Sequence, residues 1–498
     1  MSGTRPNILF FQVDQLAAHV LRAYGDPACL TPNLDALAAR GKVFDTCYCN
    51  FPLCAPSRAS MAAGRLCSAI GAYDNAAELA ASTPTYAHHL AAAGYRTALS
   101  GKMHFIGPDQ HHGFHDRLTA DLYPADFAWA PNWADEGKRD TNDARSVTVS
   151  GVCARSVQIE FDEEVTFHAE RYLYDRAAKQ DGPFFLQVSY THPHEPYLCL
   201  QEFWDLYEDA PIPDPAVPAL TEKEHDAHSV RILRDFGMLD APISTEDVTR
   251  ARRAYYGAVS YVDSLVGRVL GALDRAGLTD NTVILFTSDH GDFLGERGMW
   301  FKKHFYEPSI RVPLMIAGTG ITSGRCETPV SLVDLLPTFA ALAGAPAPDD
   351  TDGTDILSLD PDPDRVICAE YLAEATSAPI VMVRKGAWKY IHSEDDPPLL
   401  YNLASDPNET QNLASDPAHA DTLAAMQDEV RARWDLPALK AAILHSQAQR
   451  RLIRQAHATG GTPRWNHGEV AGQDVRWYRG DGGYSNWAFD YLPPQDDG

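Results

Sequence analysis

The sequence predicts an α/β fold in which a large, mostly parallel sheet lies between layers of helices. Short apolar runs alternate with helical stretches along most of the chain, as in proteins built from βα units. Several runs end in polar residues, as parallel strands do when functional groups gather at their carboxyl ends. These runs are residues 8–13 before Asp14, 95–99 before Lys102, 184–190 before His192 and His194, and 282–287 before Asp289.

Two helices between these runs are marked by their periodicity and by their end signals. Residues 33–40 form one, with Gly41 as its expected stop. A longer helix precedes the fourth strand and ends at Gly277, because apolar residues recur there at steps of three and four. The residues on this apolar face are Tyr255, Ala258, Val262, Leu265, Val269 and Leu273.

The sequence predicts an α/β domain over residues 1–375, a smaller C-terminal α+β subdomain over 376–458 and an extended tail over 459–498. Residues 380–384, 388–392 and 399–401 are predicted to be short antiparallel strands, and a helical segment spans 417–449. The tail carries too many large rings to leave in water, so we expect it to pack on the body or on a neighbouring subunit. These rings are Trp465, Trp477, Tyr478, Tyr484, Trp487, Phe489 and Tyr491.

Composition excludes several classes of protein. The formal net charge of -26 disfavours nucleic acid and anionic membranes as partners. No window approaches the roughly 20 apolar residues of a membrane span, and the run at 8–13 is too short for a signal peptide. Nine cysteines, an odd number, are typical of reduced thiols rather than of a disulfide framework. We therefore expect a cytoplasmic protein.

The sharpest local signal is Cys54-Ala55-Pro56-Ser57-Arg58. It places a thiol in a turn with a guanidinium four residues later, so that Arg58 could hold an anion near Cys54. One alternative is a buried structural cysteine. Another is a zinc cluster with Cys47 and Cys49, although the spacing differs from that of the usual paired-cysteine sites.

This pentapeptide resembles the sulfatase signature, in which a separate enzyme oxidises the cysteine to formylglycine. Four further segments resemble sulfatase segments in family order, so the resemblance covers nearly the whole chain and implies the alkaline phosphatase-like fold. They are residues 6–14, 31–41, 101–104 and 288–292. The choline sulfatase branch is the most similar, through residues 73–78, 84–90, 101–104, 123–127, 191–194 and 294–298.

The resemblance implies one divalent metal ion bound by Asp14, Asp289, His290 and the modified Cys54. Gln15 stands where many sulfatases have a second aspartate, and Asp289-His290 replaces the more usual Asp-Asn. Both departures are typical of the subgroup of choline sulfatases and phosphonate monoester hydrolases. Oxygen-rich ligation suits calcium, magnesium or manganese, with calcium preferred, and the imidazole keeps manganese in consideration.

The resemblance also implies catalytic roles in which a hydroxyl of hydrated formylglycine attacks sulfur. Arg58, Lys102 and Lys302 would hold the sulfate oxygens, and His194 or Lys302 would protonate the leaving alcohol. His104 would deprotonate the second hydroxyl. Substrate contacts are expected from Asn75 to the sulfate, and from Trp129 and Glu374 to a choline headgroup.

Each of these assignments has a plainer alternative. Lys102 could be a solvated lysine, His192 could replace His194, and Lys303 could replace Lys302. The pair Asp289-His290 could form a surface turn, and the histidines at 111, 112 and 115 are interpreted as loop residues. Related proteins form dimers or tetramers, so a homo-oligomer is expected.

Three functions remain open from the sequence. The first is hydrolysis of a small alkyl sulfate such as choline sulfate, or of an aryl sulfate. The second is hydrolysis of phosphonate monoesters or phosphodiesters at the same site. The third is a non-catalytic binding protein in which Cys54 stays a thiol.

Overall fold

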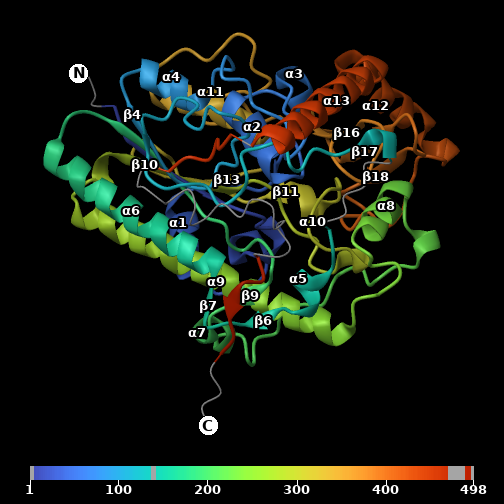
Figure 1. Ribbon diagram of the computed structural model, residues 1–498, viewed down its shortest axis with the longest axis horizontal. Coiled ribbons are helices and arrows are strands. Elements are labelled where there is room, and N and C mark those ends of the chain that lie inside the picture. Colours follow the sequence, from blue (N-terminus) through green and yellow to red (C-terminus); the bar gives the residue numbers. More distant parts are fainter. Residues whose placement is uncertain (1–4, 136–141, 462, 469–487, 495–498) are drawn as a thin grey trace.

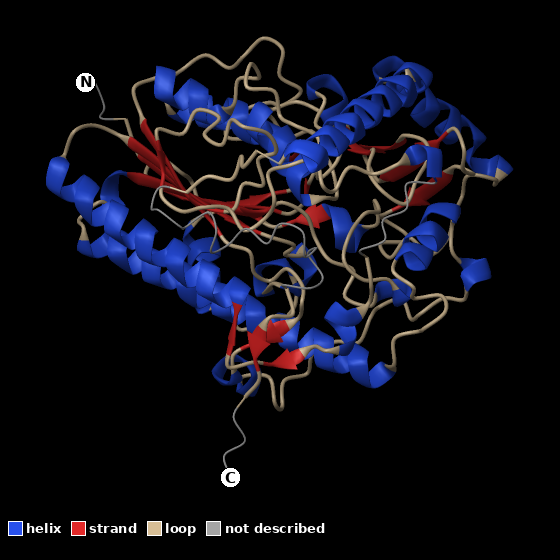
Figure 2. Cartoon of the chain, in the orientation of Figure 1, coloured by secondary structure: helices blue, strands red, loops and turns tan. Residues whose placement is uncertain are grey.

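The computed structural model describes residues 5–135, 142–461, 463–468 and 488–494 (Figure 1). An eight-stranded sheet runs through the molecule between two layers of helices (Figure 2). From one edge to the other, its strands are β13 (Gly324–Cys326), β2 (Lys42–Phe44), β12 (Leu314–Gly318), β10 (Thr282–Ser288), β1 (Asn7–Val13), β8 (Phe184–Ser189), β4 (Arg96–Gly101) and β5 (Asp116–Arg117).

Five of the seven strand pairings in this sheet are parallel, which confirms the prediction of a mostly parallel sheet. The two antiparallel pairings both involve β12, a strand that the sequence did not mark. Every residue of the central strand β1 is buried. Helices cover both faces of the sheet, so β1 is a continuous apolar run with no solvated face.

Helices α1 (Pro32–Arg40), α6 (Val157–Lys179) and α9 (Thr245–Arg275) form one layer, and α2 (Cys54–Ala63), α4 (Tyr86–Ala92) and α11 (Leu335–Leu342) form the other (Figure 1). The predicted helix over 255–273 lies within α9, and its six apolar positions are buried. Ser244 caps this helix, because its Oγ accepts a hydrogen bond from the Asp247 backbone N–H at 3.1 Å.

A second, four-stranded antiparallel sheet forms the C-terminal part. It consists of β15 (Ile367–Tyr371), β16 (Ile380–Lys385), β17 (Trp388–Ser393) and β18 (Leu399–Asn402). Its first strand therefore precedes residue 375, where the sequence places the boundary. The predicted helical segment is resolved into α12 (Ala420–Arg433) and α13 (Leu436–Gly460), and α12 packs on β16 and β17.

The remaining elements are short. The helices are α3 (Cys67–Ile70), α5 (Arg145–Thr148), α7 (Gln201–Asp205), α8 (Ala227–Asp235) and α10 (Glu307–Ile310). The strands are β11 (Arg311–Val312), β3 (Cys47–Tyr48) and β14 (Val330–Ser331), which pair with one another, and the pairs β6 (Gly151–Val152) with β9 (Leu198–Cys199) and β7 (Arg155–Ser156) with β19 (Tyr491–Leu492).

The described parts of the tail contact the body of the molecule. Trp465 lies edge-on against Phe127, with ring centroids 5.2 Å apart, and β19 pairs with β7. The other predicted packing rings, Trp477, Tyr478, Tyr484 and Trp487, lie outside the described residues. Among the helices that are described, none is both long and apolar enough to cross a membrane. The nine cysteines are free thiols.

The sheet brings the predicted functional residues to one edge. Strands β10, β1, β8 and β4 are consecutive neighbours and run parallel. Val13 pairs with Ser288, so Asp14 and Asp289 leave the sheet side by side. Gly101 pairs with Ser189, which places Lys102 next to the segment that carries His194. Residues far apart in the sequence therefore converge at the carboxyl ends of these strands.

Candidate active site

The four residues predicted as metal ligands form one buried cluster. One ligand atom from each of Asp14, Cys54, Asp289 and His290 lies within 4.8 Å of the others. Cys54 Sγ is 3.2 Å from His290 Nε2 and 3.7 Å from Asp14 Oδ1. The aspartates come from the ends of β1 and β10, whereas Cys54 is the first residue of α2.

The chemistry of this donor set fits a divalent cation. His290 Nδ1 lies 3.0 Å from the Gly291 carbonyl oxygen, to which its N–H donates. The lone pair of Nε2 then faces Asp14 Oδ1 at 3.6 Å and Asp289 Oδ1 at 3.7 Å. Burial lowers the pKa of His290, so the imidazole is neutral and able to coordinate. Acceptors that face one another without a proton between them favour a bound cation.

Helix α2 holds Cys54 at the cluster through contacts of the following residues. The Ala55 backbone N–H donates to Asn75 Oδ1 at 3.0 Å, and Ser57 Oγ donates to the Asp289 carbonyl oxygen at 2.6 Å. All ten residues of the helix are buried. Burial raises the pKa of the Cys54 thiol to about 12, and Asp14 adds to this shift. As a plain cysteine, residue 54 therefore carries a protonated thiol, which is a weak nucleophile.

Arg58 and Lys102 both contact the cluster carboxylates. Arg58 Nε donates to Asp289 Oδ2 at 2.7 Å, and its Nη1 donates to Ser189 Oγ and to the Lys102 carbonyl oxygen, each at 2.8 Å. The Lys102 ammonium donates to Asp14 Oδ2. Burial opposes ionisation of Asp14, but Lys102 and other nearby cations outweigh it and hold the pKa well below its usual value. A pocket lies beside the cluster and is lined in part by Cys54. Neither Arg58 nor Lys102 is among the described residues that line this pocket.

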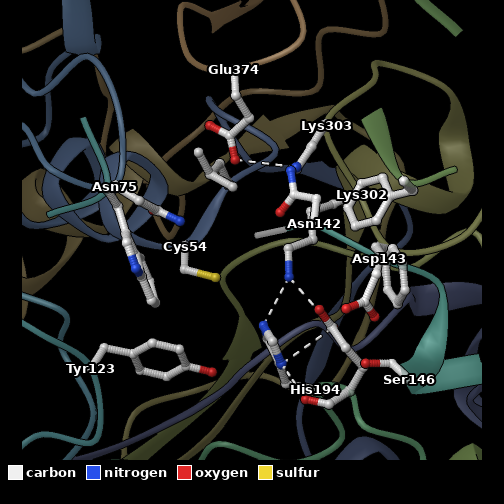
Figure 3. Close-up of a pocket in the computed structure, with 15 residues that line it drawn as sticks. Cys54, Asn75, Tyr123, Asn142, Asp143, Ser146, His194, Lys302, Lys303 and Glu374 are labelled. Atoms are coloured by element: carbon white, nitrogen blue, oxygen red, sulfur yellow. Dashed lines mark hydrogen bonds and ion pairs between the residues drawn. The ribbon is translucent and has the colours of Figure 1, made fainter. Parts of the chain in front are cut away.

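Lys302 and His194 form a second polar pair beside Cys54 (Figure 3). Lys302 Nζ donates to His194 Nε2 at 2.8 Å and also contacts Gln15 Oε1. His194 Nδ1 donates to the Glu195 carbonyl oxygen at 2.7 Å. Burial lowers the pKa of His194 to about 4, so the ring is neutral near pH 7. Burial also acts to lower the pKa of Lys302, but Glu195 and other negative groups outweigh it and raise this pKa above its usual value.

His104 lies next to the cluster and is stacked among aromatic rings. Its ring centroid is 4.8 Å from that of Tyr123 and 5.8 Å from that of Trp129. The pKa of His104 is well below its usual value because of burial and the nearby Lys102 charge. Neither of its ring nitrogens hydrogen-bonds to any residue that the structure describes. Its position suits a base, since a neutral imidazole has a lone pair to accept a proton.

The three predicted substrate-binding residues, Asn75, Trp129 and Glu374, line the same pocket as Cys54, His194 and Lys302. Asn75 Oδ1 is used by the Ala55 N–H, as described above. The preceding residue, Asp74, is held by Arg450 of α13, whose Nη1 and Nη2 each donate to a carboxylate oxygen at 2.7 Å. The C-terminal helix therefore fixes one wall of the pocket.

Residues that the sequence did not identify also line this pocket. Tyr123 belongs to the segment 123–127 that resembles the choline sulfatase branch, but no role was predicted for it. Asn142, Asp143 and Ser146 have no motif of their own, and Glu195 is marked only by its position after His194. Lys303 was weighed only as an alternative to Lys302, yet both reach the pocket. The unpredicted lining residues are Leu53, Tyr123, Asn142, Asp143, Ser146, Glu195, Phe236, Phe301 and Lys303.

The structure also shows where His192 and the two cysteines near Cys54 lie, which were considered as alternative site residues. His192 Nδ1 contacts Asp162 Oδ2 at 2.6 Å, away from the lining of the pocket. Cys47 and Cys49 are buried but are not part of the ligand cluster that the described residues form. His194, rather than His192, therefore faces Cys54.

The fold and this site define a class of hydrolase, and the chain belongs to the sulfatase family. The sulfatase family model matches residues 6–345, and a second model, the C-terminal region of N-sulphoglucosamine sulphohydrolase, matches residues 295–434. The chain is therefore a sulfuric ester hydrolase, and its core is the alkaline phosphatase-like α/β fold expected from the resemblance.

Individual sulfatases and one related hydrolase are similar to this chain over most of its length. A choline-sulfatase from Rhizobium meliloti (strain 1021) is 45% identical over 494 residues, which cover 96% of each chain. An arylsulfatase from Clostridium perfringens is 29% identical and covers 71% of this chain and 78% of its own length. Among solved structures, the phosphonate monoester hydrolase SpPMH from Silicibacter pomeroyi is similar with a TM-score of 0.71 and 25% identity, over 86% of this chain and 95% of its own.

Proposed function

We propose that this enzyme hydrolyses the sulfate monoester of a small alcohol, such as choline sulfate or another small alkyl sulfate, or an aryl sulfate, and releases the alcohol and inorganic sulfate. The observation that supports this most directly is the buried cluster of Asp14, Cys54, Asp289 and His290 beside a pocket that also holds Lys302. The likeness to a choline-sulfatase over nearly the whole chain favours a small substrate.

In this proposal residue 54 acts as formylglycine, made from Cys54 by a separate maturing enzyme, and its hydrate supplies the attacking oxygen. Asp14, Asp289 and His290 would hold a divalent cation, preferably calcium with manganese or magnesium as alternatives, which would act as a Lewis acid and lower the pKa of a coordinated hydroxyl. Arg58 pairs with both carboxylates and Lys102 pairs with Asp14, so the negative charge of the two acidic ligands is balanced in the buried site.

Lys302 is the best-placed proton donor for the leaving alcohol. It remains charged near pH 7, whereas His194 is neutral and accepts a hydrogen bond from it. His194 therefore orients the ammonium and does not itself supply the proton. Asn75 engages its Oδ1 with the Ala55 N–H, and its amide N–H groups suit a sulfate oxygen.

Replacing Lys302 by methionine is expected to slow alkyl sulfate hydrolysis by about 10²–10⁴-fold, the usual contribution of a general acid. The loss with 4-nitrophenyl sulfate is expected to be smaller, because nitrophenolate leaves without protonation. Steady-state kcat/KM values for both esters measure this difference. Lys385→Met, at an exposed lysine on β16, is the control and should leave both values unchanged. Equal losses for the two esters would argue against Lys302 as the acid.

Phosphonate monoester or phosphodiester hydrolysis is the second candidate, because two of the similar solved structures are phosphonate monoester hydrolases. Paired kcat/KM values for 4-nitrophenyl sulfate and a 4-nitrophenyl phosphonate monoester distinguish the two functions. We expect the sulfate ester to be preferred. A large preference for the phosphonate would overturn the proposal and establish the alternative.

We further propose that the enzyme works in the cytoplasm as a homodimer or homotetramer. The odd number of cysteines, none of which is paired in a disulfide, supports a reducing compartment. The aromatic-rich tail supports an assembly, and light scattering on the intact chain measures the number of subunits. Small sulfate esters are the partners of the site, and the charge disfavours nucleic acid and membranes.

A further inference from the structure

Lys303 is a buried cation in the pocket with no part in the chemistry proposed above. Its side chain is only 3% exposed, and it lines the pocket beside Lys302. The backbone φ of Lys303 is 86°, in the left-handed region that side-chain-bearing residues rarely adopt. This conformation turns the two neighbouring lysines to different partners, Lys302 to His194 and Lys303 to Glu374 (Figure 3).

The surroundings of the Lys303 ammonium are charged but do not satisfy its hydrogen bonds. Nζ lies 3.1 Å from Glu374 Oε1 and 3.9 Å from an Asp235 carboxylate oxygen, and 4.4 Å from the centroid of the Phe236 ring. Among the described residues, however, no acceptor meets it with hydrogen-bonding geometry. A buried ammonium needs acceptors for its three N–H groups. The pocket side of Lys303 is therefore suited to an acceptor supplied by a ligand.

The same contacts work against a quaternary ammonium. Such a headgroup needs a carboxylate and an aromatic face. At this end of the pocket the Lys303 ammonium already pairs with Glu374 and already lies over Phe236. A second cation would compete with it for both and would be repelled by it. A quaternary ammonium group also has no hydrogen-bond acceptor for the N–H groups of Lys303.

We propose that Lys303 determines substrate specificity: with Glu374 it forms a paired-charge subsite that selects a sulfate ester whose alcohol part is uncharged and carries a hydroxyl group. A hydroxyl can accept from the ammonium and donate to the carboxylate at once. This inference rests on the proposed sulfatase function and narrows its substrate class away from choline sulfate. Lys302 acts at the scissile bond, whereas Lys303 acts on the far end of the alcohol.

Three alkyl sulfates test this proposal on the formylglycine-containing enzyme. They are choline sulfate, its uncharged isostere 3,3-dimethylbutyl sulfate, and 4-hydroxybutyl sulfate. The wild type is expected to prefer the hydroxybutyl ester over choline sulfate by about tenfold or more in kcat/KM. Lys303→Met is expected to reduce that preference by about tenfold or more, mainly through a lower KM for choline sulfate. Choline sulfate and 3,3-dimethylbutyl sulfate have the same shape, so a difference between their kcat/KM values reports the effect of the charge alone.

A second variant protects the test if Lys303→Met does not fold. Glu374→Gln removes the nearer of the two carboxylates that face the ammonium and leaves only Asp235, 3.9 Å away. The ammonium should then repel a second cation more strongly, so the preference for the hydroxybutyl ester over choline sulfate should rise further. A wild-type preference for choline sulfate, or an unchanged ratio in a folded variant that still hydrolyses 4-nitrophenyl sulfate, would overturn the role of Lys303. Failure of the wild type with every sulfate ester, 4-nitrophenyl sulfate included, would instead overturn the proposed function itself.

Discussion

Replacing Cys54 by alanine is expected to lower the turnover of 4-nitrophenyl sulfate by about 10⁴-fold or more, the scale of loss when an enzyme's nucleophile is removed. In the proposed mechanism the side chain at position 54 supplies the attacking oxygen after oxidation, and no other cysteine among the described residues lies in the ligand cluster. The fold should survive, because the contacts that anchor α2 come from the Ala55 backbone and from Ser57. Circular dichroism and thermal unfolding check the fold alongside the activity.

Cys326→Ala is the matched control for this experiment. Cys326 is partly exposed on the edge strand β13, and its loss should change neither activity nor folding. Mass spectrometry of the wild-type peptide over residues 43–58 shows the chemical state of residue 54. We expect the aldehyde after coexpression with a maturing enzyme. Full activity in Cys54→Ala, or an active wild type that carries only the thiol, would refute the mechanism. An inactive wild type in which Cys54 stays a thiol after coexpression would instead support the binding-protein hypothesis.

Much of the catalytic centre could be predicted because it depends on short-range sequence features. A strand that is buried on both faces can be predicted from its continuous apolar run, and the first polar residue after the run marks the carboxyl end of the strand. Asp14 and Asp289 follow β1 and β10 in this way, and the pairing of these strands brings the two aspartates together. The signature around Cys54 marked the third ligand, although the sequence placed this thiol in a turn and the structure places it at the start of α2.

The walls of the pocket could not be predicted, because they depend on contacts between distant segments. Arg450 and Asp74 are 376 residues apart in the chain, and only the packing of α13 shows that they meet. The ion pair between Lys303 and Glu374 likewise depends on how two loops face each other. Asp74 lies in the choline sulfatase-like segment 73–78, and Glu374 was predicted to contact the substrate. Nothing in the sequence, however, indicates that their partners are Arg450 and Lys303.

The orientation of the basic residues also required the structure. The sequence predicts that Arg58 grips the substrate anion, but its guanidinium contacts Asp289, Ser189 and the Lys102 carbonyl. Its side chain is fully buried. Two cations beside two carboxylates make this region close to neutral, so a divalent ion would give the site the positive charge that attracts a sulfate ester.

Removing divalent cations with a chelator is expected to abolish activity and to lower the thermal stability of the enzyme. Without a cation, the carboxylates of Asp14 and Asp289 and the Nε2 lone pair of His290 face one another in a buried site. A ligand that binds only the folded state, at a hundred times its Kd, stabilises that state by about 2.7 kcal/mol. Thermal unfolding before and after chelation therefore reports binding independently of turnover, and adding back calcium, magnesium or manganese singly ranks the ions.

Variants at the cluster show whether the stabilising ion binds there. Asp14→Asn should lose the metal-dependent shift in Tm, whereas Asp45→Asn, which alters a partly exposed carboxylate paired with Arg325, should retain it. His290→Asn exchanges a nitrogen donor for an amide oxygen, so it should favour calcium over manganese relative to the wild type. Elemental analysis shows whether the chelated enzyme is free of metal. A metal-free enzyme that is fully active and has the same Tm as before chelation would contradict the metal site. Because the carboxylates already have Arg58 and Lys102 as counter-charges, the expected loss is of function and several degrees of stability rather than of the fold.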